Sequence, residues 1–211
     1  MKNVLIKISG EYFQNESESL SMLNNTNLAS VVFMTGGGNI IRGSHVMKRT
    51  SYVDNAGMAS TLVNSFLLAN ILSTPTCVMS NTFSGNGLER YNPYLIMHNR
   101  ASVSYILAAG VGCGYLSTDT AMVIRALEVN SDACIKVTKV GGIFDKDPKY
   151  NSDAKLISMM KYKKCAAYDD VAITIAENNN MPIFVMDLYN LFLYLEDKDF
   201  IGTIIGNKNT Y

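Results

Sequence analysis

The sequence contains no tryptophan, only two histidines and four prolines, and charged residues make up just 17% of its 211 positions. Two histidines, His45 and His98, are too few to build a histidine-based metal centre. The 18 basic and 18 acidic side chains balance, so the formal net charge is zero. A balanced chain offers no electrostatic reason to bind nucleic acid or a membrane surface.

Long apolar runs are also missing. No run approaches the ~20 residues that a membrane span needs, and the opening residues 1–7 reach a lysine too early to resemble a signal peptide. We therefore expect a cytoplasmic protein. The cysteines form no CxxC pair, so we expect small buried hydrophobes rather than a zinc site or a disulfide framework; they are Cys77, Cys113, Cys134 and Cys165.

What the sequence does contain is apolar material: hydrophobic residues account for 48% of the chain, which is enough to build a core. Short β-branched runs alternate with segments of helical period, a pattern that predicts a single α/β domain with a mainly parallel sheet. The predicted strands are residues 3–8, 30–34, 76–79, 102–108, 134–137, 183–185 and 202–205. The predicted helices are residues 54–72, 118–129 and 170–177.

A glycine-rich loop follows the second predicted strand. Gly36, Gly37 and Gly38 let the backbone approach an anion closely, and Arg42 is placed to add a two-pronged phosphate contact. The alternative is a tight turn without a ligand. No GxxxxGK[ST] motif, no GxGxxG motif opening a helix and no protein-kinase signature is present, so any nucleotide phosphate would need a different cradle.

Two charged residues near predicted strand ends form a second candidate site. Lys7 lies in an apolar strand, where it either reaches solvent from a sheet edge or neutralises a transferring phosphoryl group. Asp119 follows a second glycine-rich stretch at the start of a predicted helix. It is either an ordinary helix cap or, at the same sheet edge, a partner that orients Lys7.

Five segments, taken in order, resemble the bacterial-type UMP kinase family of the amino-acid kinase superfamily. They are Lys7-Ile8-Ser9-Gly10-Glu11, Gly36 to Gly43, Asp54-Asn55-Ala56-Gly57-Met58, Ser117-Thr118-Asp119-Thr120-Ala121 and Lys136 to Pro148. The resemblance implies a three-layer αβα sandwich around a mainly parallel sheet. It also implies transfer of the ATP γ-phosphoryl group to UMP in the presence of Mg²⁺, within a homohexamer. The N-terminal part would bind UMP and the part from about residue 130 would bind ATP.

The resemblance also carries residue roles onto matching positions. It implies catalytic roles for Lys7, Arg42, Asp119 and Asp169. The implied ATP contacts are Lys7, Ile8, Ser9, Gly10, Gly38, Arg42, Thr138, Phe144 and Asp147. The implied UMP contacts are Gly37, Asp54 (on the ribose), Gly57, Val111, Gly112, Cys113, Gly114, Tyr115, Leu116, Ser117 and Thr118. No protein metal site is implied, because the nucleotide phosphates would hold most of the Mg²⁺ coordination.

Three departures from the family pattern stand out. Val111 and Cys113 replace polar residues of the UMP segment, so backbone groups would have to read the base. Gly141 stands where the family usually has Asp. The segment 14–27, which in the family contains a loop linked to GTP activation, is shorter here and rich in Asn, so we expect turns there and little response to GTP.

Two other functions remain open at this stage. A kinase of the same fold acting on a carboxylate or a carbamate is one, but Asp54 would repel a small anionic acid while suiting a ribose. A non-catalytic nucleotide- or oxyanion-binding protein of this fold is the other, and the presence of Lys7, Arg42 and Asp119 argues against it.

Overall fold

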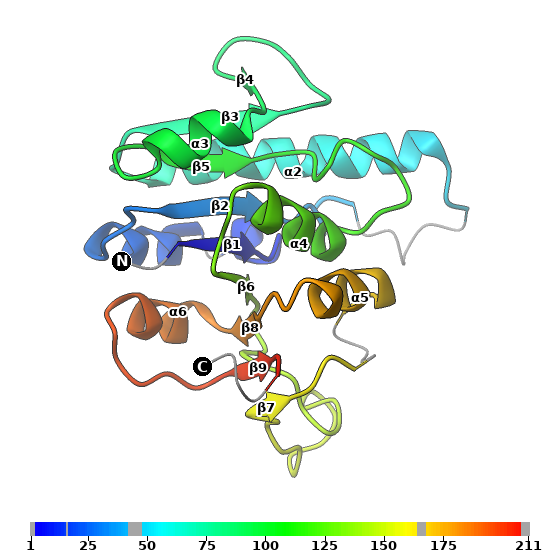
Figure 1. Ribbon diagram of the computed structural model, residues 1–211. Helices are drawn as coiled ribbons and strands as arrows, with labels where there is room; N and C mark the ends of the chain where they lie inside the picture. The colour runs from blue at the N-terminus through cyan, green and yellow to red at the C-terminus, as the bar shows by residue number, and fades with distance from the viewer. Residues whose placement is uncertain (1–2, 16, 42–47, 164–167, 208–211) are drawn as a thin grey trace.

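The computed structural model describes residues 3–15, 17–41, 48–163 and 168–207 (Figure 1). Arg42, His45 and Cys165, all singled out from the sequence, lie outside these ranges. The described strands form one sheet in the order β4-β3-β5-β2-β1-β6-β8-β9-β7. Their bounds are β1 (Val4–Ile8), β2 (Val31–Thr35), β3 (Thr76–Ser80), β4 (Glu89–Arg90), β5 (Ser104–Leu107), β6 (Ala133–Val137), β7 (Met159–Met160), β8 (Ile183–Met186) and β9 (Thr203–Ile205).

The sheet is parallel except at one edge, where β9 runs antiparallel to β8 and β7 follows the direction of β9. β1 lies in the interior of the sheet, paired with β2 on one side and with β6 on the other. The chain thus builds the β2 side first and then crosses to the β6 side. In open α/β sheets such a switch point, at the carboxyl ends of the strands, is where ligands bind.

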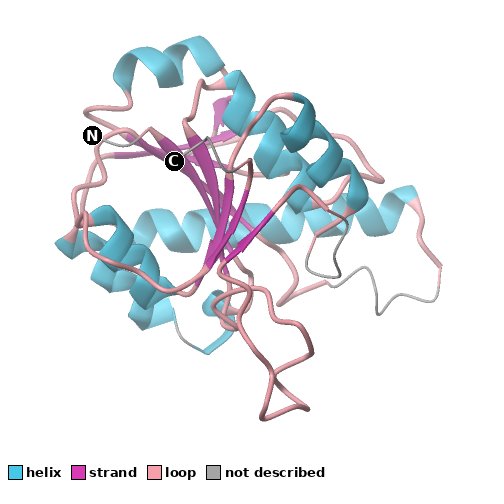
Figure 2. Cartoon of the chain, turned by 60° about the horizontal axis from the view of Figure 1, so that its bottom comes forward, coloured by secondary structure: helices cyan, strands magenta, loops and turns pink. Residues whose placement is uncertain are grey.

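Helices cover both faces of the sheet (Figure 2). Alternate residues of each strand separate the core into two layers, because successive side chains of a strand point to opposite faces. Leu5 belongs to the layer that packs against α3 (Pro93–Asn99), α4 (Thr118–Glu128) and α5 (Asp170–Asn178). Ile6 belongs to the layer on the other face, whose helices are α1 (Tyr12–Asn15), the 3₁₀ helix η1 (Ser17–Asn25), α2 (Ser51–Ile71) and α6 (Leu188–Leu195). The predicted three-layer αβα sandwich is confirmed.

The seven predicted strands all occur, with ends that differ by at most two residues. The three predicted helices also occur, although the helix predicted over residues 54–72 begins three residues earlier, at Ser51. α3 and α6 were not predicted. Pro93 at the first turn after the capping Asn92 is an ordinary helix start that marks α3. α6 is apolar almost throughout and therefore has little helical period to detect.

The segment 14–27 contains no long helix, as its asparagines indicate, but it is more regular than a series of turns. η1 spans nine residues and buries Leu20 and Leu23 completely. Asn24 donates to the carbonyl oxygen of Ile71 at 2.9 Å and accepts from the backbone N–H of Ser73 at 2.8 Å, which fastens η1 to the end of α2.

Of the three cysteines that the structure describes, one meets the expectation of burial. Cys134 is fully buried, Cys77 is half-buried, and Cys113 is exposed. Cys113 is exposed because it lies in the loop before α4 rather than in a strand. In the described ranges, no helix is both long enough and apolar enough to cross a membrane.

Candidate active site

Three charged side chains meet at the carboxyl ends of β1 and β6. Lys7 and Lys136 are direct cross-strand partners, so their side chains leave the sheet on the same face. Asp119, in the first turn of α4, accepts from both: its Oδ1 lies 2.6 Å from Lys7 Nζ and its Oδ2 lies 2.9 Å from Lys136 Nζ. This geometry excludes the edge-strand interpretation of Lys7 and confirms that Asp119 orients it.

The cluster is largely withdrawn from water, since only 9% of the Lys7 side chain and 15% of the Asp119 side chain are exposed. Burial alone would raise the pKa of Asp119, but the two lysines outweigh it and hold that pKa below its ordinary value. Lys136 Nζ also lies 4.2 Å from the centre of the Tyr168 ring, a cation–π contact. Two cations and one anion leave the cluster with a net positive charge.

The loops that follow β1 and β2 pack tightly against each other. A Cβ at Gly10 would lie 2.8 Å from the backbone nitrogen of Gly38, so only glycine permits this approach. Asn64, fully buried on α2, donates to the carbonyl oxygen of Gly36 at 2.6 Å and to Asn39 Oδ1 at 2.7 Å. The glycine loop is therefore held in place by a helix side chain.

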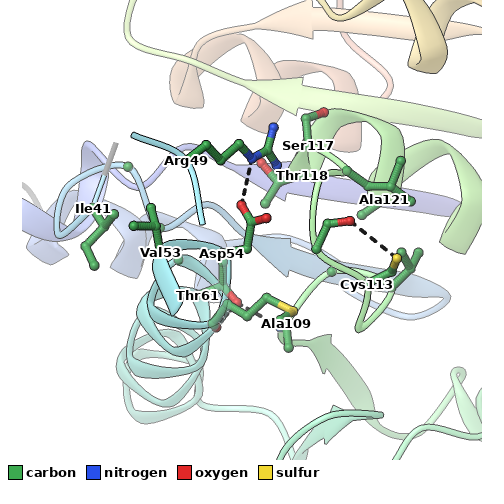
Figure 3. Close-up of a pocket in the computed structure, with 18 residues that line it drawn as sticks. Ile41, Arg49, Val53, Asp54, Thr61, Ala109, Cys113, Ser117, Thr118 and Ala121 are labelled. Atoms are coloured by element: carbon green, nitrogen blue, oxygen red, sulfur yellow. Dashed lines mark hydrogen bonds and ion pairs between the residues drawn. The ribbon is translucent and has the colours of Figure 1, made fainter. Parts of the chain in front are cut away.

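A cavity of about 400 Å³ opens between this loop, the start of α2 and the segment before α4. Its volume lies within the range of small-molecule sites. Figure 3 shows Val53 and Asp54 on its α2 side and Cys113, Ser117 and Thr118 on its α4 side. The lining residues are Gly37, Gly38, Ile41, Arg49, Val53, Asp54, Gly57, Met58, Thr61, Ala109, Gly110, Val111, Cys113, Gly114, Leu116, Ser117, Thr118 and Ala121. Of the sequence-predicted UMP contacts, Gly112 and Tyr115 do not line it.

Asp54 lies in the first turn of α2, which begins after the capping residue Thr50. Its Oδ1 accepts from Arg49 Nε at 2.8 Å, and its Oδ2 accepts from the backbone N–H of Tyr115 at 2.9 Å. The Arg49 guanidinium lies 5.1 Å from the centre of the Tyr115 ring. The carboxylate that was predicted to hold a ribose thus also ties α2 to the segment before α4.

Most of the predicted ATP contacts lie apart from the cavity, but Gly38 lines it. Ile8 ends β1, and the N–H of the next residue, Ser9, donates to the carbonyl oxygen of Val137 at 3.0 Å. Thr138, Phe144 and Asp147 follow β6, on the far side of β1 from β2, and none of them lines the cavity. The predicted ATP contacts after β6 are therefore separate from the predicted UMP contacts, and the lysine pair lies between them.

Asp169 caps the N-terminus of α5, where its Oδ1 accepts from the backbone N–H of Ala172 at 2.8 Å. The same carboxylate accepts from Thr120 Oγ1 at 2.8 Å and from the Ser117 hydroxyl. Asp169 is thus joined to the first turn of α4, beside Asp119. Its catalytic role stays a prediction.

Sequence reasoning did not assign a role to Lys136 or to Asn64. A signal for Lys136 was available, since β1 and β6 both carry a lysine at their fourth position in otherwise apolar strands. Asn64 gives no such signal, because a polar residue on a long helix ordinarily faces solvent. Its function as a support for the glycine loop is visible only in three dimensions.

Comparison with known proteins identifies the family of this chain. Residues 2–187 match the amino acid kinase family. The uridylate kinase of Campylobacter concisus is 34% identical over 94% of this chain and 95% of its own length. The uridylate kinase of Campylobacter jejuni is 31% identical over 98% of both chains.

Solved structures of UMP kinases are similar to this chain over nearly its whole length. The UMP kinase of Bacillus anthracis superposes with a TM-score of 0.85 at 27% identity, covering 98% of this chain and 96% of the other. The UMP kinase of Ureaplasma parvum has a TM-score of 0.83 at 25% identity, covering 98% and 99%. The family match, the identities and the coverage together show that the chain belongs to the amino acid kinase family and, within it, to the uridylate kinases.

Proposed function

We propose that this protein transfers the γ-phosphoryl group of ATP to UMP, giving UDP and ADP. The observation that carries the proposal is the Lys7–Asp119–Lys136 cluster, at the boundary between a nucleotide-sized cavity and the segment that follows β6. The acceptor would enter on the β2 side of β1 and the donor on the β6 side. Their phosphates would then meet at the carboxyl end of β1.

The cavity offers the chemistry that a nucleoside monophosphate needs. Asp54 provides a carboxylate that can accept from sugar hydroxyls. The glycine loop offers backbone N–H groups without side chains in the way of a phosphate. Because Val111 and Cys113 have little hydrogen-bonding ability, we assign recognition of the base to backbone groups of the segment 110–117.

The lysine pair provides what phosphoryl transfer demands of a protein, namely positioning and charge neutralisation. Negative charge develops on the transferring group and on the bridging oxygens. Two ammonium groups, already held in place by the carboxylate of Asp119, would stabilise that charge. The partial burial of the cluster strengthens this attraction relative to water. An oxygen of the UMP phosphate takes the γ-phosphoryl group directly while its bond to ADP breaks, so the reaction requires no covalent enzyme intermediate.

Mg²⁺ fits this site as a companion of ATP rather than as a resident ion. Among the described residues, no group of three or more His, Cys, Asp and Glu side chains is arranged to hold a metal. Asp119 and Asp169 already accept hydrogen bonds from lysines and hydroxyls. Mg²⁺ is commonly held by substrate phosphates and water, and bound in that way it would neutralise phosphate charge.

Assembly is a further part of the proposal: the protein forms a homo-oligomer, a hexamer by resemblance, in the cytoplasm. Support comes from α2, on which Val63, Phe66 and Leu67 share one face and are 50%, 39% and 43% exposed. Three large apolar side chains at spacings of three and four residues form a stripe that a second copy would cover.

A coupled ADP-release assay tests the activity. UMP, CMP, dUMP, carbamate and N-acetylglutamate are offered as acceptors with ATP and Mg²⁺, and we expect turnover with UMP. Lys146→Ala is a matched control for lysine variants, because it removes only a surface ion pair with Asp153. Turnover with carbamate or N-acetylglutamate but not UMP would replace the proposal by the carboxylate or carbamate kinase, and no turnover with any acceptor would favour the binding protein.

A further inference from the structure

Arg125 lies on α4 with only 3% of its side chain exposed. Its Nε donates to the carbonyl oxygen of Gly110 at 3.1 Å, and its Nη1 donates to Glu128 Oε2 at 2.7 Å. The guanidinium carbon lies 3.7 Å from the centre of the Tyr91 ring. A buried guanidinium is costly unless its donors are satisfied, so this set of contacts is what allows a cation here.

Tyr91 and Glu128 hold the guanidinium in one orientation. The Tyr91 hydroxyl donates to Glu128 Oε2 at 2.6 Å, and the Tyr91 N–H donates to the carbonyl oxygen of Ser80 at 3.1 Å, at the end of β3. Burial and the Glu128 carboxylate raise the pKa of Tyr91, so its hydroxyl remains a donor at neutral pH. The Tyr91 ring fixes the plane of the guanidinium and the Glu128 carboxylate fixes one of its edges. Nε of Arg125 is thereby directed at the carbonyl oxygen of Gly110.

Gly110 belongs to a tight turn of backbone, in which the Gly112 N–H donates to the carbonyl oxygen of Ala109 at 2.9 Å, and which contacts from two helices also hold. Ala109 and Gly110 both have positive φ, at 61° and 58°, and Ala109 carries the steric cost of that region for a residue with a Cβ. The hydroxyl of Thr61, on α2, accepts from the Ala109 N–H at 2.8 Å. Arg125 holds the next carbonyl from the α4 side. Val111, Cys113 and Gly114, which follow, line the cavity.

We propose that Arg125 is a positioning residue for the nucleoside monophosphate, acting through the Gly110 carbonyl on the cavity-lining segment 110–117. The inference rests on the proposed function, because UMP is the ligand assigned to that cavity. Arg125 does not line the cavity itself. Its effect is on acceptor binding, since the segment lies on the β2 side of the lysine pair and the proposed ATP contacts lie beyond β6.

Arg125→Lys and Arg125→Met test this in the full-length protein. A lysine keeps the charge but replaces the flat, forked donor by a single point, which cannot serve Gly110 and Glu128 and stack on Tyr91 together. Methionine removes all donors at similar volume, and the lysine variant covers the case in which it fails to fold. We expect the KM for UMP to rise roughly tenfold or more, as for loss of a charged hydrogen bond. The KM for ATP and kcat should stay within about twofold of the wild type.

Arg100→Met is the matched control. Arg100 Nη1 donates to the carbonyl oxygen of Val129 at 2.9 Å, so it makes the same kind of contact, but neither Arg100 nor Val129 lines the cavity. We expect this variant to keep the wild-type KM for UMP even where its melting temperature falls. A parallel rise in the two KM values of the Arg125 variants, or an equal effect of Arg100→Met, would overturn the inference.

Amide hydrogen exchange gives a readout that does not depend on turnover. Exchange at residues 110–116 should be faster in both Arg125 variants and unchanged in Arg100→Met. Wild-type protein that fails to phosphorylate UMP would count against the proposed function. Wild-type activity together with an unchanged UMP KM or unchanged exchange in the Arg125 variants would count against the positioning role alone.

Discussion

At the scale of single residues, the carboxylate of Asp119 forms ion pairs with two ammonium groups, those of Lys7 and Lys136. Lys7 and Lys136 stand side by side on neighbouring strands, and without Asp119 their charges would repel each other. An ammonium group that is oriented before the substrates arrive needs no rearrangement when charge develops in the transition state. The chemistry proposed for this site therefore depends on each member of the cluster separately.

Lys7→Ala should lower kcat by ~10²–10³, the usual effect of removing one preorganised group that stabilises transition-state charge. UMP affinity should change much less, because Lys7 does not line the acceptor cavity. Steady-state rates with UMP varied at saturating ATP measure both quantities. Turnover close to that of the wild type would remove Lys7 from the mechanism.

Asp54→Asn should weaken UMP binding by ~1–3 kcal/mol, the range for a lost hydrogen bond to a charged group. ATP binding should barely change. Calorimetry with each nucleotide measures the two affinities. Asp153→Asn is the control, since it makes the same change in an exposed ion pair outside the cavity and should leave both affinities unchanged. Equal losses for both nucleotides in Asp54→Asn would indicate instead that the start of α2 is disrupted.

The sequence allowed some of these contacts to be predicted and not others. The Lys7–Asp119 pair was one of the alternatives that the sequence left open, and it depended on a lysine in an apolar strand and an acidic residue at a helix start lying at the same sheet edge. The contact between Asp54 and the Tyr115 N–H joins residues 61 positions apart, and no local pattern encodes it. The same holds for Arg125 and Gly110, because a buried arginine on a helix looks like a surface one until the fold is known.

At the scale of elements, η1 occupies most of the segment 14–27, in which the family resemblance placed an effector loop. Its apolar side chains are buried against the sheet face, and Asn24 is hydrogen-bonded to the end of α2. The prediction of turns in this region from its asparagines was too coarse. Leu20 and Leu23, three residues apart, match the period of a 3₁₀ helix, in which residues at i and i+3 share a face.

We expect GTP to change the rate of UMP phosphorylation less than twofold, a coupling free energy below about 0.5 kcal/mol and under typical allosteric values. The reason is that the short packed segment 14–27 leaves little chain for an effector loop. Initial rates against UMP at fixed ATP, with and without GTP, measure the coupling. Activation of several-fold would show that the effector site does not require this segment.

At the scale of the whole molecule, Asp119 joins the two halves of the sheet, because it binds Lys7 in β1 and Lys136 in β6 while lying on α4. The central order of the strands was not predictable from local pattern, which gives the direction and existence of strands but not their neighbours. The resemblance to a family supplied the three-layer architecture and the mainly parallel sheet, whereas the strand order came from the structure. The register that sets the two lysines side by side emerged only from the structure.

Asp119→Asn should destabilise the protein by about 3–5 kcal/mol at neutral pH, the usual consequence of leaving buried charges without their partner. Because the folded-state pKa of Asp119 is lowered, its stabilising contribution is present above the ordinary value of 3.8 and is lost as pH falls below it. Urea unfolding at several pH values should therefore show a constant difference from the wild type above about pH 5, narrowing in stronger acid.

Asp153→Asn provides the comparison for that experiment. It breaks an ion pair with Lys146 in which both side chains are well exposed, so its effect should stay within about 1 kcal/mol at any pH. A difference between Asp119→Asn and the wild type that widens in acid would contradict the direction of the Asp119 pKa shift.

β9 is the last strand to be synthesised, so the two halves of the proposed site are completed at different times. All residues that line the cavity precede residue 122, so they are synthesised before β8 and β9. β7, in contrast, pairs with β9, and Thr203 accepts from the Ile143 N–H at 2.8 Å. The part proposed to hold ATP therefore gains these contacts only when residues 203–205 are made, and we expect a chain that ends before them to contain every cavity residue but to lack a completed donor half.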